Sequence, residues 1–109
     1  MHNLKLWSPT SLDNNLEDFK NSLSKSLNIQ NYEELHKWSI ENKEKFWDEI
    51  WNYTKIIGAK KGTIFNEDND FIKSEFFKDS ELNYTENCLL KDDSSDAIIS
   101  YNENEEKIV

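Results

Sequence analysis

Apolar residues recur at three- and four-residue steps near the start of the chain. The stripe consists of Leu12, Leu16, Phe19, Leu23 and Leu27. This spacing lines one face of an α-helix. Ser8 and Pro9 precede the stripe and match a helix start, because serine caps helix N-termini and proline is tolerated in the first turn. The pattern predicts a helix that starts at Pro9, divides near residues 13–15 and ends at residues 28–31.

Two further helices are predicted in the first half of the chain. Asn31 is a suitable N-cap, and Glu34 three residues later completes a pattern close to a capping box. The next helix is predicted over residues 43–57 with Asn42 as its cap, because aromatic and aliphatic residues form two adjacent rows there. Gly58 is predicted to end this helix in the left-handed conformation.

The helical periodicity is lost in the second half of the chain. Residues 63–70 are polar and acidic and predict a loop, whereas residues 82–90 predict a short helix capped by Asn83. Residues 97–101 have the composition of a single strand. We expect this strand to have no pairing partner within the chain, which would leave its edge open.

The expected fold class is mainly α, within one region that covers residues 1–109. Helices occupy residues 8–58, and a loop, a short helix and a strand occupy residues 59–109. Aromatic residues make up 13% of the chain although hydrophobic residues reach only 36%. Because disordered chains are poor in aromatic residues, we expect a core that is thin and built from a few large side chains. We expect the remaining rings to rest on a polypeptide body outside this chain.

The net charge and the single cysteine indicate which partners and which cellular compartment to expect. The formal net charge is −9, and every basic side chain apart from histidine is a lysine. A nucleic-acid-binding protein needs a basic face that displaces counterions, so this class is excluded. The single cysteine, Cys88, allows no internal disulfide and suits a reducing compartment. We find no signal peptide and no run of the ~18–20 apolar residues that a membrane span needs. We therefore expect a cytoplasmic protein without membrane or nucleic-acid partners.

Four stretches of the sequence carry a resemblance to a known enzyme family. They read LWSP at residues 6–9, YEELHKWSI at 32–40, FWDEIWNY at 46–53 and FFKDSELNYTENCLL at 76–90. In order and approximate spacing they resemble the N-terminal region of the acetoacetyl-CoA synthetase family, within the AMP-forming acyl-CoA synthetase superfamily. The Trp-Ser pair in the second stretch and the LNYTEN run in the fourth favour the acetoacetyl branch over the related acetyl-CoA synthetases.

The resemblance implies that this chain is the leading part of an adenylate-forming α/β ligase domain. The implied parent activity converts ATP, acetoacetate and CoA to acetoacetyl-CoA, AMP and pyrophosphate, with Mg²⁺ as a further cofactor. The family's phosphate loop, adenylate-binding residues and catalytic lysine lie downstream of the region that resembles this chain. The resemblance therefore implies no catalytic, cofactor-binding or metal-binding residue here. It implies one partner, the remainder of the ligase, on the same or a separate polypeptide.

His2, His36 and Cys88 are the side chains that we considered as metal ligands. No ligand spacing such as Cys-x-x-Cys accompanies them, so we expect no metal site. The sequence also indicates no partner base for Cys88, which we expect to be a small buried thiol. The acidic run at residues 67–70 lacks the glycine and the terminal glutamate of a calcium loop, and a solvated loop is expected there.

The aromatic residues of the third helix admit two interpretations. They are Phe46, Trp47, Trp51 and Tyr53. A ligand platform is one interpretation, but large rings at helical spacing are typical of a helix face that packs on a core. We therefore expect these residues to be core.

Three polar residues near the predicted short helix also leave alternatives open. Asn83, Glu86 and Asn87 are spaced three and four apart, so they either form hydrogen bonds with the remaining ligase or cap the helix. Two hypotheses remain for the whole chain. It is a structural segment of the ligase, or it is a free-standing acidic helical module that docks its aromatic face on another protein.

Overall fold

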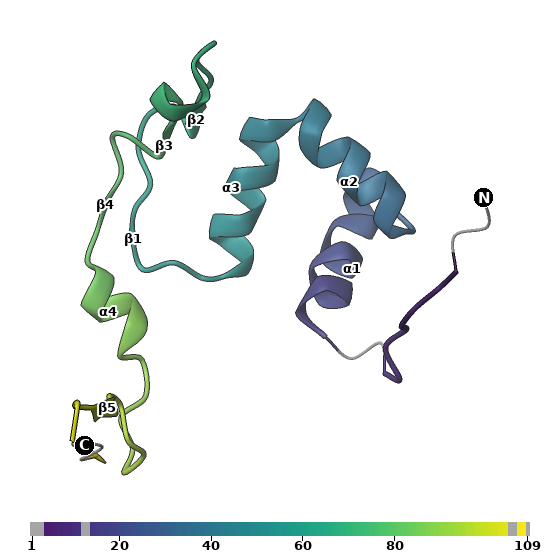
Figure 1. Cartoon of the computed structure of the whole chain (residues 1–109). Helices are drawn as coiled ribbons and strands as arrows, with labels where there is room; N and C mark the ends of the chain where they lie inside the picture. Colours follow the sequence, from purple (N-terminus) through teal and green to yellow (C-terminus); the bar gives the residue numbers. More distant parts are fainter. Residues whose placement is uncertain (1–3, 12–13, 105–106, 109) are drawn as a thin grey trace. The chain divides into compact units, whose positions relative to one another are not determined.

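The chain divides into two units, Met1–Thr54 and Lys55–Val109. The computed structural model describes residues 4–11, 14–104 and 107–108. The first unit contains three helices, α1 (Asn15–Leu27), α2 (Tyr32–Glu41) and α3 (Lys43–Tyr53). Short strands, a 3-10 helix and a short α-helix make up the described part of the second unit (Figure 1). The predicted predominance of helix is therefore confirmed for the first unit.

Helix α1 starts later than the sequence pattern predicts. Asn14 caps it, because the Asn14 side chain accepts a hydrogen bond from the Glu17 N–H at 3.0 Å. Acidic residues in the first turn, Glu17 and Asp18, add favourable interactions with the helix dipole. Residues 8–11 are not helical, so the predicted start at Ser8 and Pro9 is wrong. Asparagine caps as well as serine does, and the sequence alone did not show which cap is used. Leu12 lies outside the described residues.

Helix α2 starts where its capping pattern predicts. The Asn31 side chain accepts a hydrogen bond from the Glu34 N–H at 2.9 Å. The Glu34 carboxylate in turn accepts from the Gln30 N–H at 2.8 Å. The reciprocal bond of a capping box usually returns to the cap residue itself. Here it reaches one residue further back, and it satisfies a backbone donor of the α1–α2 connection.

Helix α3 ends at Tyr53 rather than at residue 57. The hydroxyl of Thr54 donates to the Ile50 carbonyl at 2.6 Å, and Lys55 adopts a left-handed φ of 55°. Gly58 therefore does not end the helix, contrary to the prediction. It lies in strand β1 (Gly58–Ala59), where an added Cβ would come within 2.8 Å of the Glu81 carbonyl oxygen. Glycine is needed at position 58 because the backbone at Glu81 comes too close to leave room for a side chain.

The core of the first unit is small and joins all three helices. Four buried residues form one cluster: Phe19, Leu23, Ile29 and Leu35. Trp38, Phe46, Ile50 and Tyr53 pack against them. The Phe19 ring meets Phe46 and Tyr53 edge to face, with centroid distances of 6.0 and 5.2 Å. Trp51 is also buried, whereas Trp47 is half-buried. The predicted core role of the α3 aromatic residues is thus confirmed for Trp51 and for the half-buried rings that contact Phe19.

The second unit is built from three antiparallel strand pairs. Strand β1 pairs with β4 (Glu81–Leu82), β2 (Phe65–Asn66) with β3 (Glu75–Phe76), and β5 (Ser100–Tyr101) with β6 (Lys107–Ile108). Two predictions are therefore corrected. The predicted loop at 63–70 contains β2, and the strand near the C-terminus has a partner. Strand β2 and strand β6 are each two residues long and lie in polar, acidic runs, so neither shows the alternation that predicts a strand.

Side chains extend the β1–β4 pair at both ends. The Asn87 side chain accepts from the Ile57 N–H at 2.7 Å and donates to the Ile57 carbonyl at 2.9 Å. At the other end, the Ser80 hydroxyl accepts from the Lys61 N–H at 3.0 Å. Asn87 belongs to helix α4 (Tyr84–Cys88), which starts at the predicted cap, Asn83. These side chains pair with the backbone as a neighbouring strand would.

The second unit lacks a core of its own among the residues that the structure describes. None of its described side chains is buried; the most enclosed, such as Ile64, Phe65 and Phe77, are half-buried. Its strands are two residues long, and isolated two-stranded ribbons are marginally stable in water. Backbone and side-chain hydrogen bonds therefore hold this unit together with little help from apolar burial.

We predict that Phe19→Ala lowers the free energy of unfolding of the helical unit by about 3 kcal/mol. The substitution removes a buried ring that meets Phe46 and Tyr53 on α3, and such truncations cost about 3–5 kcal/mol. Urea unfolding followed by the helical circular dichroism signal measures the change. Leu27→Ala, at a residue that is 41% exposed, serves as the control and should cost less than about 1 kcal/mol. Equal losses for the two variants would contradict the assignment of Phe19 to the core.

We also predict that Asn87→Ala reduces the hydrogen-exchange protection of the Ile57 amide roughly fivefold, since one hydrogen bond contributes about 1 kcal/mol. Asn87→Asp keeps the acceptor for that amide but loses the donor to the Ile57 carbonyl, so its protection should fall between the two. Thr85→Ala, on the same helix, is the control. Unchanged protection in Asn87→Ala would show that this side chain does not hold Ile57.

Candidate functional site

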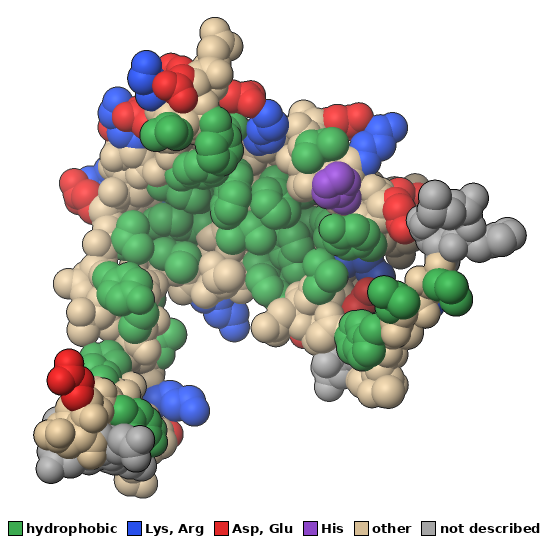
Figure 2. All heavy atoms as spheres, in the orientation of Figure 1, with side chains coloured by type: hydrophobic (Ala, Val, Ile, Leu, Met, Phe, Trp, Pro, Cys, Tyr) green, Lys and Arg blue, Asp and Glu red, His purple; other side chains and the backbone are tan. Residues whose placement is uncertain are grey.

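An apolar groove lies between the three helices of the first unit. Its volume is about 300 Å³, and the buried Phe19 and Leu35 form its floor. The remaining lining residues are Leu16, Tyr32, His36, Ser39, Phe46 and Ile50. Figure 2 shows hydrophobic side chains gathered on the face of the helices that also presents the histidine. A groove with buried apolar residues at its floor and exposed residues at its rim is suited to an apolar side chain from another polypeptide.

Polar groups at the rim of this groove are engaged locally. The rings of Tyr32 and His36 stack with centroids 6.1 Å apart, and the Ser39 hydroxyl donates to the His36 carbonyl at 2.7 Å. His36 is therefore part of the groove wall. His2 lies outside the described residues. Within the described ranges, no group of three or more His, Cys, Asp or Glu side chains is arranged to hold a metal ion.

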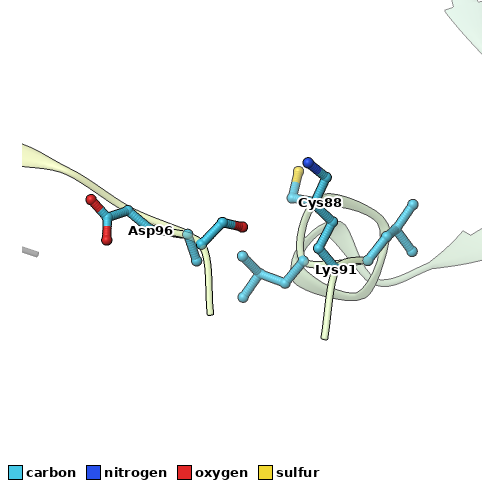
Figure 3. Close-up of a pocket in the computed structure, with 7 residues that line it drawn as sticks. Cys88, Lys91 and Asp96 are labelled. Carbon is cyan, nitrogen blue, oxygen red and sulfur yellow. The ribbon is translucent and has the colours of Figure 1, made fainter. Parts of the chain in front are cut away.

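A second, larger hollow starts at the end of helix α4 and has a volume of about 490 Å³. Its lining includes Cys88, Leu89, Leu90 and Lys91 on one side and residues 95–97 on the other. Figure 3 shows the Asp96 carboxylate directed away from the side chains of Cys88 and Lys91. The hollow therefore presents mainly apolar atoms to solvent.

Cys88 is exposed, which overturns the prediction of a small buried thiol. Helix α4 is only five residues long, and no described residue around it is buried, so the unit offers no interior for the thiol. Its neighbour one turn earlier is Tyr84. A hydrogen bond with the Cys88 side chain, followed by the charge of that group, raises the pKa of the Tyr84 hydroxyl. This contact suppresses tyrosine ionisation.

The polar residues of α4 bind within their own unit. Asn83 accepts a hydrogen bond from the Glu86 N–H at 3.0 Å, as a capping residue does. The Asn87 side-chain amide forms hydrogen bonds with the backbone of Ile57, and it also donates to the Asn83 carbonyl at 2.9 Å. The structure thus favours capping and internal bonding for this cluster. Sequence reasoning missed Ile57 as the partner because the contact spans 30 residues.

Acidic residues 68 and 70 stabilise a turn. The Asp68 carboxylate accepts from the Asp70 N–H at 2.8 Å, and the Asp70 carboxylate accepts from the Ile72 N–H. Both carboxylates therefore serve as local caps of the backbone. Throughout the described residues, no helix has the length and apolar character that crossing a membrane requires.

Comparisons with known proteins give one consistent family. A family model described as the acetyl-coenzyme A synthetase N-terminus matches residues 32–88. The chain is 34% identical to acetoacetyl-CoA synthetase of Gallus gallus over 118 aligned residues, covering 100% of this chain and 17% of the relative. It is 36% identical to acetoacetyl-CoA synthetase of Xenopus tropicalis, with 94% and 16% covered.

A relative with a different name is malonamoyl-CoA synthetase of Penicillium aethiopicum, 29% identical over 69% of this chain and 12% of the relative. No solved structure matches the chain. The chain spans about one sixth of the length of the first relatives that it matches, 17% of each. The matched segment includes the groove residues from α2 and α3, the β1–β4 pair and helix α4.

We predict that a thiol reagent modifies Cys88 readily in the folded chain, at a rate close to that in the denatured chain. The reason is that the side chain is exposed and no described neighbour encloses it. Stopped-flow absorbance with a disulfide reagent measures both rates, and Cys88→Ser provides the blank. Strong protection in native buffer would show that the thiol is buried after all.

Proposed function

The chain belongs to the acetyl-coenzyme A synthetase N-terminus family, and we propose that it is the N-terminal structural segment of an acetoacetate–CoA ligase. The proposed parent reaction converts ATP, acetoacetate and CoA to acetoacetyl-CoA, AMP and pyrophosphate. Relatives that align along almost the whole chain carry the name of this enzyme. The acyl group in the name of the fungal relative also has a second carbonyl at its third carbon. The shared chemistry supports a short 3-oxo carboxylate as the substrate class of the parent.

In this proposal the ATP, Mg²⁺ and CoA of the parent bind to the remaining part of the ligase. Acyl adenylation needs hydrogen-bond donors around a phosphate, a metal ion and an oriented carboxylate. The two glycines of this chain serve other purposes. Gly58 permits the close approach of β4, and Gly62 takes a positive φ of 65° directly beside the Asp79 side chain. This segment would contribute structure to the adenylating domain.

The observation that carries the proposal is the match along the whole chain to the leading sixth of one enzyme, combined with apolar surface that the chain leaves uncovered. The second unit has no buried side chain among its described residues. Such a segment gains stability when a larger body covers its apolar side chains. The proposed partner is therefore the remainder of the ligase, on the same or a separate polypeptide.

The alternative of a free-standing acidic binding module is less well supported. That hypothesis explains the exposed aromatic residues, but it does not account for a full-length alignment with a single family of ligases. The net charge of −9 disfavours nucleic acid and anionic membranes as partners. A cytoplasmic location is proposed for the same protein, since its exposed cysteine suits a reducing compartment.

We predict that a chimera, in which this chain replaces the aligned region of the Gallus gallus enzyme, is soluble and retains acetoacetate-dependent release of AMP. Release of AMP from ATP in the presence of CoA measures the activity. The same enzyme with that region deleted is the control and should lose activity through instability, because its covering segment is missing. An inactive chimera, or an active deletion enzyme, would contradict the proposed role.

A further inference from the structure

Two adjacent apolar side chains protrude from the second unit. Phe71 is 87% exposed and Ile72 is 89% exposed. They lie on the 3-10 helix η1 (Phe71–Lys73), the short coil between strands β2 and β3 in Figure 1. Burying one such side chain releases about 1.5–3 kcal/mol. Adjacent side chains of this size in full contact with water therefore form a favourable binding element.

The loop that carries these side chains is fixed by hydrogen bonds. The Asp68 N–H donates to the Ser74 hydroxyl at 3.1 Å, which closes the loop. The Lys73 N–H donates to the Asp70 carbonyl at 2.8 Å, and the Ser74 N–H donates to the Phe71 carbonyl at 3.2 Å. The exposure of Phe71 is thus a property of an ordered turn. Because the turn is already formed, its docking would cost little further conformational entropy.

The two aromatic residues of the β2–β3 strand pair contact each other. Phe65 and Phe76 face each other across the strand pair with ring centroids 4.8 Å apart. Beyond them, the Phe77 N–H donates to the Ile64 carbonyl at 2.8 Å. Phe65 and Phe76 lie against one another, whereas Phe71 and Ile72 are almost fully exposed.

The charges around the turn indicate the chemistry of its partner. Glu67, Asp68 and Asp70 precede the two apolar residues, and Lys73 follows them, 3.6 Å from the Asp70 carboxylate. The acidic excess repels anionic lipid headgroups and phosphate backbones. It favours a protein pocket with an apolar floor and basic residues at its rim.

We propose that Phe71 and Ile72 form an anchor that inserts into an apolar, basic-rimmed pocket on the remaining part of the ligase. This inference rests on the proposed function, because the pocket belongs to the five sixths of the relatives' length that this chain does not match. The anchor lies inside the residues matched by the family model. The proposed contact is noncovalent, and it would hold this segment in position on the remaining part of the ligase.

Photo-crosslinking in the active chimera tests the contact directly. A benzoylphenylalanine placed at position 71 should crosslink to a peptide of the ligase body, identified by mass spectrometry. The same photoreactive residue at position 69, where the chain has an exposed asparagine, should give little crosslinking to that peptide. A crosslink from position 71 to a second copy of this chain, or only to residues of its own unit, would overturn the inference.

Substitutions test whether the contact stabilises the assembly. Phe71→Ser should lower the urea midpoint of the chimera, and Phe71→Leu, which keeps an apolar side chain, should restore most of it. The isolated chain should unfold at an unchanged midpoint in both variants, because Phe71 is exposed there. Asn69→Ser is the matched control in the same loop and should change neither midpoint.

The two levels of the proposal fail in different ways. If the unsubstituted chimera is inactive, the proposed function fails, and the anchor fails with it. If the chimera is active but Phe71→Ser leaves its midpoint unchanged and position 71 does not crosslink to the body, the function stands and the anchor is wrong.

Discussion

The edge-to-face contacts of Phe19 hold the first unit together. This one ring on α1 touches Phe46 and Tyr53, both on α3. The hydroxyl of Tyr53 returns a hydrogen bond to the Asn15 carbonyl at the start of α1, at 3.1 Å. Helices of about a dozen residues are marginally stable by themselves. The Phe19 contacts join α1 to α3, and the contact between the Trp38 and Phe46 rings joins α2 to α3. The groove exists only because Phe19 and Leu35 fix its floor.

The two units rely on different forces. The helical unit buries Leu23 and Ile29 at 2% and 3% exposure, so apolar burial supports it. The second unit depends instead on paired backbone groups and on the side chains of Ser80 and Asn87. Net hydrogen-bond contributions in water are small. A segment of this kind needs a covering partner more than the helices do, which agrees with the proposed place of the chain in a larger ligase.

Local signals in the sequence predicted some elements and misplaced others. The starts of α2 and α4 were predictable because Asn31 and Asn83 bond to amides only three residues away. The start of α1 was misplaced because two cap residues compete, and Gly58 was misread because glycine serves both left-handed turns and close backbone contacts. The strand pairs join residues through tertiary contacts, which single-sequence patterns do not reveal. For the candidate site, the excess of aromatic residues indicated a docking role, but the exposure of Phe71 depends on how the loop closes.

The ties at the two ends of the β1–β4 pair have a consequence for how this segment can vary among ligases. Asn87 is hydrogen-bonded to Ile57, and Ser80 is hydrogen-bonded to Lys61. These hydrogen bonds hold the two ends of the segment from Lys61 to Ser80 together. Insertions or deletions inside that enclosed stretch leave both ties intact, and their effect on stability grows only slowly with loop length. Length changes between Ile57 and Lys61, or between Ser80 and Asn87, would break a tie. The loop between β2 and β3 can therefore change in length to suit the body that we propose it contacts, while the β1–β4 pair keeps the same dimensions.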